Sequence, residues 1–194
     1  MTTNLKKGEH HSKPIPPNKC HKVYVDVIGP VSVKSCKKYL LTIMDAFSRY
    51  AVAIPMEGKS ACEVSEALTI SLTGVFGGAP LTIVADRGME FVGRVTRTAM
   101  SMLGHTFRFI PADLHQSNMV ERFHKTLTSM IRAIRTEGVK QWVPAVRMAL
   151  QYYNHTSTRA PATLRYRYIW GLTRATQGSW PPQDRRLHLW TTPT

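Results

Sequence analysis

The sequence predicts a mixed α/β fold in which helices flank a five-stranded sheet that contains both parallel and antiparallel strands. Short runs of β-branched and aromatic residues are followed by longer segments with helical spacing, in the order β-β-β-α-β-α-β-α-α. The 194 residues are also 43% apolar and 9% aromatic, which is enough material for a substantial core.

The first three predicted strands follow one another at the short distances typical of hairpins. They are VYVDVIG (23–29), YLLTIMD (39–45) and YAVAIP (50–55). Because these runs are almost unbroken by polar residues, we expect a sheet that is buried on both faces.

The middle of the chain predicts two strands and two helices. Ser60 and Glu63 have the spacing of a capping box, which begins a helix that Gly77-Gly78 ends. The two further strands are LTIVAD (81–86) and TFRFI (106–110), and a second helix runs between them from about Glu90 to Leu103.

Two more helices are predicted near 118–136 and 143–154, and Pro144 stands at the start of the second, where proline is tolerated. Large side chains in and near the last three predicted helices are expected to fill the core rather than to bind ligands. These are Met100, Met102, Met130, Met148, Trp142, Tyr152 and Tyr153.

The charge balance indicates a polyanionic partner. The formal net charge is +14 and the isoelectric point is near 10.1, so nucleic acid and anionic membranes are the two candidates. The sequence has no apolar run of the roughly 18 to 20 residues that span a bilayer, and no secretory signal is evident. We therefore expect a nucleic-acid partner and no membrane.

The cysteines predict a reducing compartment. Cys20, Cys36 and Cys62 are odd in number and widely separated, which favours free thiols over a disulfide framework. The spacing of His10, His11, Cys20 and Cys36 matches no common zinc motif.

Composition divides the chain into three parts. Residues 1–20 have four lysines and three prolines and predict a flexible basic arm. Residues 21–171 carry the strands and helices, and residues 172–194 predict a basic tail or connector.

Three acidic residues are candidates for chemistry. Asp26 lies within an apolar strand, where an unpaired charge is costly to bury, and Asp86 ends an equally apolar strand before Arg87-Gly88. Asp45 also ends a strand, but with Ser48 and Arg49 it is expected to set a turn. Glu121 is open to two interpretations, since it stands three residues after Asn118 and could complete a capping box or hold a metal ion.

Four ordered motifs resemble the integrase core of retroviruses and retrotransposons, and most closely that of gypsy-type elements. They are VYVDVIGP, LTIMDAFSRYAVAIPM, IVADRGMEF and QSNMVERFH, followed by a W…YN…P pattern at Trp142, Tyr153-Asn154 and Pro161. The resemblance implies an RNase H-like fold and a catalytic triad of Asp26, Asp86 and Glu121.

The resemblance also implies the reaction and the partners. The three carboxylates would hold Mg²⁺ or Mn²⁺, as two ions, for 3′-end processing and strand transfer that join element DNA to target DNA. Such cores form homodimers or higher oligomers and act in the nucleus and in the cytoplasmic particle of the element. The implied DNA contacts are Lys125, Arg132, Gln116, Ser117 and Asn118, while Arg87 could bind either phosphate or a carboxylate.

The sequence departs from the gypsy-type pattern before Glu121. His115 replaces a proline, and the glycine that usually follows Asn118 is missing. The segment between Asp86 and Glu121, residues 87 to 120, is therefore one residue shorter than in the family. The further domains of the family, a zinc domain and a basic C-terminal domain, are not recognisable, as expected of a core taken from a longer protein. A catalytically impaired, integrase-derived DNA-binding or scaffolding protein is therefore the alternative, and an RNase H-type nuclease is a third hypothesis that the QSN…VERFH motif disfavours.

Overall fold

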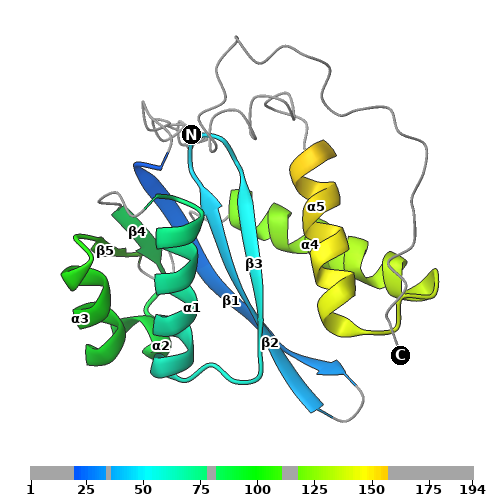
Figure 1. The fold of residues 1–194 in the computed structure, drawn as a ribbon, viewed down its shortest axis with the longest axis horizontal. Coiled ribbons are helices and arrows are strands. Elements are labelled where there is room, and N and C mark those ends of the chain that lie inside the picture. Colours follow the sequence, from blue (N-terminus) through cyan, green and yellow to red (C-terminus); the bar gives the residue numbers. More distant parts are fainter. Residues whose placement is uncertain (1–19, 34–35, 78–81, 111–117, 157–194) are drawn as a thin grey trace, which may run out of the picture.

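The computed structural model describes residues 20–33, 36–77, 82–110 and 118–156, and these form a five-stranded sheet with helices on both faces (Figure 1). The strands are β1 (Lys22–Val33), β2 (Cys36–Asp45), β3 (Ala51–Met56), β4 (Thr82–Ala85) and β5 (Thr106–Phe109). Their order is β3-β2-β1-β4-β5. The first three strands pair antiparallel, whereas β4 pairs parallel with β1 and β5 with β4. The predicted mixed sheet is confirmed.

The helices cover the sheet in two groups, with α1, α2 and α3 on one face and α4 and α5 on the other (Figure 1). They are α1 (Ala61–Gly74), α2 (Met89–Val92), α3 (Arg94–Met102), α4 (Asn118–Thr136) and α5 (Trp142–Thr156). Within the described ranges, no helix has both the length and the apolar composition to cross a membrane.

Alternation along β2 explains why the sheet has a separate core on each face. Leu41 and Ile43 pack toward α1, whereas Leu40 and Met44 pack toward α4 and α5. Successive side chains of a strand point to opposite faces, so every residue of β2 from Leu40 to Asp45 is buried. The prediction of a sheet buried on both faces is confirmed here.

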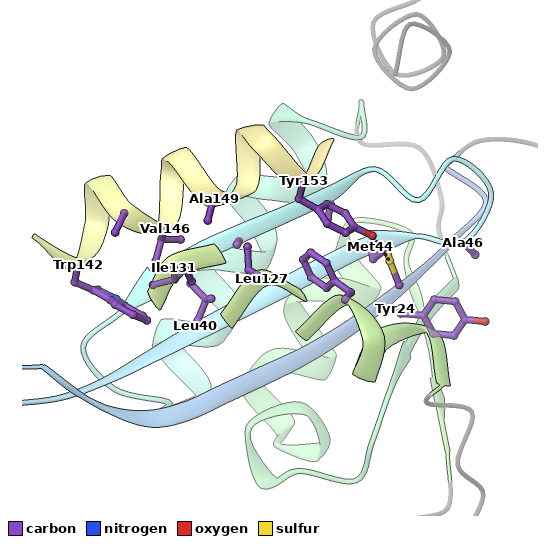
Figure 2. Packing of buried hydrophobic residues seen from close by; sticks show 14 of the residues in the cluster. Tyr24, Leu40, Met44, Ala46, Leu127, Ile131, Trp142, Val146, Ala149 and Tyr153 are labelled. Atoms are coloured by element: carbon purple, nitrogen blue, oxygen red, sulfur yellow. Dashed lines mark hydrogen bonds between the residues drawn. The ribbon is translucent and has the colours of Figure 1, made fainter. Parts of the chain in front are cut away.

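The core beneath α5 is formed by side chains from two helices and four strands. Figure 2 shows Trp142, Val146, Ala149 and Tyr153 of α5 beside Leu127 and Ile131 of α4, above Leu40, Met44 and Tyr24. The Tyr153 ring packs on Phe123 with the ring centres 4.6 Å apart. Asn154 adds a polar anchor, since its amide accepts from the N–H of Ala51 and donates to the C=O of the same residue.

Two helix boundaries differ from the prediction. The expected helix from Glu90 to Leu103 is two helices, because the chain is extended at Gly93, with φ −54° and ψ 143°. A β-carbon at Gly93 would lie 3.1 Å from the Met89 carbonyl oxygen, so this bend is tightly packed. The first helix begins with the predicted Ser60 and Glu63 capping box but ends at Gly74, before the two glycines expected to stop it.

The predicted tail and residues 1–19 of the predicted arm lie outside the described residues, as do residues 157–171 of the predicted core. The large side chains expected in the core divide into three groups, of which Met130, half-buried against the core, is the first. Trp142, Tyr153 and Met100 are buried as predicted. Tyr152, Met102 and Met148 are exposed, which corrects their assignment to the core.

Candidate active site

The parallel pairing of β1 with β4 brings Asp26 and Asp86 to corresponding positions on neighbouring strands. The last paired residues are Tyr24 and Val84, and each acid stands two residues beyond its member of that pair. Tyr24 and Val84 both pack toward α4, and the side-chain period of a strand is two residues. Both acids therefore belong to the face of the sheet that α4 covers.

Asp26 is a half-buried carboxylate held in a fixed orientation. Its Oδ1 accepts from the backbone N–H of Val27 at 2.7 Å, and its side chain is 40% exposed. Burial is the main cause that raises the pKa of Asp26 to about 6, and the negative charges of Asp86 and Glu90 raise it further against the Val27 hydrogen bond. The site thus concentrates negative charge around a partly desolvated acid.

Asp86 is exposed and is oriented by the turn that follows β4. Its Oδ1 accepts from the N–H of Gly88 at 2.9 Å. A β-carbon at Gly88 would lie 3.0 Å from Asp86 Oδ1 and 2.9 Å from the Glu90 carboxyl carbon. Glycine therefore lets two carboxylates approach the same point of the backbone. The Glu90 side chain is 11% exposed and lies 3.7 Å from the Lys59 ammonium.

Asp45 also ends a strand, but it has a structural role, as predicted. It is fully buried, and its Oδ2 accepts from both the N–H and the hydroxyl of Ser48. Its Oδ1 accepts from the N–H of Cys20. These bonds fix the turn after β2 and occupy the carboxylate.

The core sets the orientation of α4 and hence that of Glu121. Phe123, Leu127 and Ile131 are buried against the sheet and α5. Glu121 is exposed at the N-terminal end of the helix. The side chain of Asn118 lies outside the description, so the capping-box interpretation of Glu121 stays a prediction.

The predicted DNA contacts that the structure describes are all exposed. Lys125 and Arg132 lie on α4, and Arg87 follows Asp86. Gln116 and Ser117 lie outside the described residues.

His124 occupies the space between α4 and the two central strands. Its Nε2 lies 2.9 Å from the Thr42 hydroxyl oxygen, and its Nδ1 lies 3.7 Å from Asp26 Oδ2. Asp26 and Thr42 are directly paired across β1 and β2, which explains how one ring reaches both. Burial lowers the pKa of His124 to about 4, while the charge of Glu121 acts in the opposite direction.

The donor set fits a divalent cation in its chemistry. Carboxylate oxygens are the ligands that Mg²⁺ and Mn²⁺ prefer, and a cation would offset the charge that raises the pKa of Asp26. As the described side chains are placed, no three His, Cys, Asp or Glu residues are grouped closely enough to hold a metal ion. Asp86 and Glu121 are exposed, so their side chains can change rotamer without disturbing the core.

Comparison with protein families decides the identity of this fold and site. Residues 17–136 match the family described as "Integrase core domain". The chain belongs to the integrase core domain family. The predicted resemblance to retroviral and retrotransposon integrases is thereby confirmed, and the mixed sheet with helices on both faces is an RNase H-like fold.

Relatives of this integrase core occur in retroviruses and in a transposon. It is 32% identical over 127 residues to the Gag-Pol polyprotein of avian reticuloendotheliosis virus, across 65% of this chain and 11% of that protein. It is 27% identical over 169 residues to the Retrovirus-related Pol polyprotein from transposon 412 of Drosophila melanogaster, across 86% of this chain and 13% of that protein. The chain thus spans about a tenth of the length of these relatives.

A solved structure with the same fold is the trimeric form of the HTLV-2 integrase catalytic core domain in complex with magnesium. The two chains superpose with a TM-score of 0.66 at 18% sequence identity. The superposition covers 79% of this chain and 98% of the HTLV-2 chain.

Two residues of this integrase core were not predicted from the sequence as neighbours of the site. Glu90 stands four residues after Asp86, a separation at which two side chains meet on a helix but not reliably across a turn and a helix start. His124 stands three residues after Glu121, where an i, i+3 pair shares one helix face. That second spacing was available in the sequence.

Proposed function

We propose that this chain is the catalytic core of an integrase that processes DNA 3′ ends and joins element DNA to target DNA. The observation that carries the proposal is the alignment of Asp26 with Asp86 on the face covered by α4, with the pKa of Asp26 raised to about 6. A partly desolvated carboxylate beside other acids is an arrangement typical of functional sites.

Asp26, Asp86 and Glu121 would hold Mg²⁺ or Mn²⁺, as two ions. When bound, such ions supply Lewis-acid activation of a water molecule or of a DNA 3′ hydroxyl for in-line attack on a phosphodiester. The chain's own contribution is orientation. The N–H groups of Val27 and Gly88 each occupy one oxygen of an aspartate, which leaves the other oxygen of each free to face the ligand.

DNA would follow the exposed face of α4. Lys125 and Arg132 stand on this helix, seven residues apart and so near one line of its surface. Phosphate contacts of this kind position DNA without reading its sequence. Arg87, at the end of β4, is the phosphate contact proposed nearest to the two aspartates.

The proposed assembly is a homodimer or a higher oligomer bound to element ends and target DNA. The trimeric, magnesium-bound form of the HTLV-2 core supports both the metal and the oligomer. Residues 1–20 and 172–194 are proposed as a basic arm and a basic tail around a core of residues 21–171. The proposed locations are the nucleus and the cytoplasmic particle of the element.

The test is a reaction on branched DNA that mimics a joined product, with either Mg²⁺ or Mn²⁺. Asp26→Asn, Asp86→Asn and Glu121→Gln are each expected to reduce cleavage and rejoining to background while retaining DNA binding. Glu66→Gln is the matched control, because Glu66 is exposed on α1, on the opposite face of the sheet. Full activity in any of the three site variants would refute the proposal.

A non-catalytic DNA-binding or scaffolding protein is the second candidate. The observation that favours it is the dispersed placement of the acids, together with the missing glycine before Glu121. It predicts DNA binding that weakens steeply with salt and no reaction of the unaltered chain with either metal. The same assay therefore separates the two functions.

A further inference from the structure

The imidazole ring of His124 lies between Thr42 and Asp26, in a position suited to binding a cation. It stands one helical turn after Glu121 on α4, and its side chain is 18% exposed. One ring nitrogen lies 2.9 Å from the Thr42 hydroxyl oxygen, and the other lies 3.7 Å from Asp26 Oδ2.

The hydrogen bonds of Thr42 determine which nitrogen of His124 carries the proton. The Thr42 hydroxyl has one hydrogen, which it donates to the backbone carbonyl of Asp26 at 3.0 Å. Its oxygen can therefore only accept from the ring, so the Nε2 of His124 is the protonated nitrogen. A neutral imidazole has one N–H, which leaves Nδ1 with a lone pair on the side of Asp26.

Two acceptors then face each other without a hydrogen atom between them. The 3.7 Å that separates His124 Nδ1 from Asp26 Oδ2 exceeds hydrogen-bond length. A lone pair and a carboxylate oxygen repel one another unless a cation lies between them. Two ligands of one ion, each bound at about 2.1 Å, are at most about 4.2 Å apart, so the observed separation is compatible with a shared ion.

We propose that His124, through Nδ1, is a nitrogen ligand of the divalent cation that Asp26 holds, so that α4 supplies the site with two ligands, Glu121 and His124. This inference rests on the proposed function, whose cation site it extends. A Glu-x-x-His pair at i, i+3 on a helix is a known metal-binding arrangement. Metal-bound histidines also donate their second ring N–H to a fixed acceptor, and Thr42 is such an acceptor.

The ligand set changes the metal that the site prefers. Carboxylates alone suit Mg²⁺, whereas an imidazole nitrogen favours transition metals. We therefore expect the chain to prefer Mn²⁺ over Mg²⁺ more strongly than a site with three carboxylates would. This preference is a property of binding and can be measured without DNA.

The experiment uses the full chain with Mn²⁺ as the probe and pulsed electron paramagnetic resonance as the readout. The bound Mn²⁺ is expected to show the nitrogen modulation of a directly coordinated imidazole. His124→Asn should abolish this modulation and reduce the Mn²⁺ affinity at least tenfold or so, with a smaller loss for Mg²⁺. His155→Asn is the matched control, since His155 is exposed in the last turn of α5, and it should leave the spectrum unchanged.

A second variant tests the same inference through the proton on Nε2. Thr42→Val keeps the shape of a buried residue but removes the acceptor that fixes the ring, and loss of such a partner costs about 10- to 100-fold in metal affinity. Unfolding of the variant in metal-free buffer shows whether the substitution destabilises the fold. A larger loss of affinity for Mn²⁺ than for Mg²⁺ would show that the substitution acts through the histidine ligand.

Bound Mn²⁺ without nitrogen modulation, or modulation that persists in His124→Asn, would overturn the inference and leave the integrase function intact. Failure to bind Mn²⁺ at all without DNA would overturn it as well. Nitrogen-coordinated Mn²⁺ in a chain that never reacts with DNA would support the ligand and refute the proposed function. The two ideas can therefore fail separately.

Discussion

Replacing Asp26 by asparagine should stabilise the metal-free protein at neutral pH. The pKa of this carboxyl rises from 3.8 to about 6 on folding, so the folded chain holds a proton that the unfolded chain releases. The energy needed to ionise Asp26 in the folded state therefore destabilises the protein increasingly as the pH rises from about 4 to 6, and is fully present above that range. An asparagine cannot ionise, and it can still accept from the Val27 N–H.

The magnitude follows from the size of the rise in pKa. At 1.36 kcal/mol per pH unit, the rise corresponds to about 3 kcal/mol. The side chain is 40% exposed, so solvent screens part of this energy, and about 1–2 kcal/mol of stabilisation is expected. For a domain of this size the melting temperature would rise by about 3–6 °C.

Urea unfolding of both proteins in EDTA at pH 7.5 and at pH 4 measures this effect. The gain in free energy of unfolding should be present at pH 7.5 and small at pH 4, where Asp26 is protonated in the folded state and only partly ionised in the unfolded chain. Glu66→Gln, an exposed acid on α1, should change the free energy of unfolding little at either pH. An Asp26→Asn protein that is equally stable or less stable than the original at pH 7.5, with normal stability at pH 4, would refute the reasoning.

Four further outcomes are expected from urea unfolding. In the Asp26→Asn protein, the free energy of unfolding should increase as the pH is raised from about 4 to 6.5. Burial lowers the pKa of His124 to about 4, so in this range the unfolded chain binds a proton on His124 that the folded chain does not; a flat pH profile would contradict this. Asn154→Ala leaves the N–H and C=O of Ala51 unpaired and should cost about 2–4 kcal/mol, whereas the exposed Gln151→Ala should cost little. Leu127→Ala removes a fully buried side chain and should cost about 2–5 kcal/mol; a cost below 1 kcal/mol would mean that α4 is not fixed by this contact. A glycine inserted after Asn118 falls in the first turn of α4 and should cost only about 1 kcal/mol, the usual cost of a glycine in a helix, and a loss of several kcal/mol would contradict this.

The strands were predictable because their hydrophobic pattern reports burial directly. Every apolar run expected to be a strand is one, and Asp26 was recognisable as an anomaly within such a run. The break at Gly93 was not predictable, because a single glycine inside helical spacing is usually tolerated. The bend is closely packed, since a β-carbon at Gly93 would lie 3.1 Å from the Met89 carbonyl oxygen, whereas the Ala61 β-carbon of α1, at 3.5 Å, would be in ordinary contact with it.

The prediction that three large side chains lie in the core was wrong, because it was based on residue type alone. Met102, Met148 and Tyr152 are apolar or aromatic and were expected to be in the core, yet they are exposed. Met148 and Tyr152 are four residues apart on α5 and share a face that lies about 100° around the helix from Ala149 and Tyr153. Helical phase, rather than residue type, separates the two groups.

The residues of the candidate active site could be predicted from local sequence, but their contacts with distant segments could not. Strand endings and motifs gave Asp26 and Asp86, but the pairing of β1 with β4 that aligns them joins segments 60 residues apart. His124 faces Asp26 and Thr42 through a contact that spans 82 residues. Such neighbours depend on the register of a helix over a sheet, which no local pattern specifies.

Core packing, not the length of the preceding segment, decides which residues α4 presents to the sheet. A slip of one residue would rotate the helix by about 100° and withdraw Phe123, Leu127 and Ile131 from the core. Each of these side chains contributes about 1.5–3 kcal/mol through burial, whereas shortening a loop by one residue changes its closure entropy by only about 0.1–0.2 kcal/mol. The packing energy is larger by more than an order of magnitude. We therefore expect the glycine missing before Glu121 to leave the register of α4 over the sheet unchanged, so that the competence of the site depends on the rotamers and ligands of Asp26, Glu121 and His124.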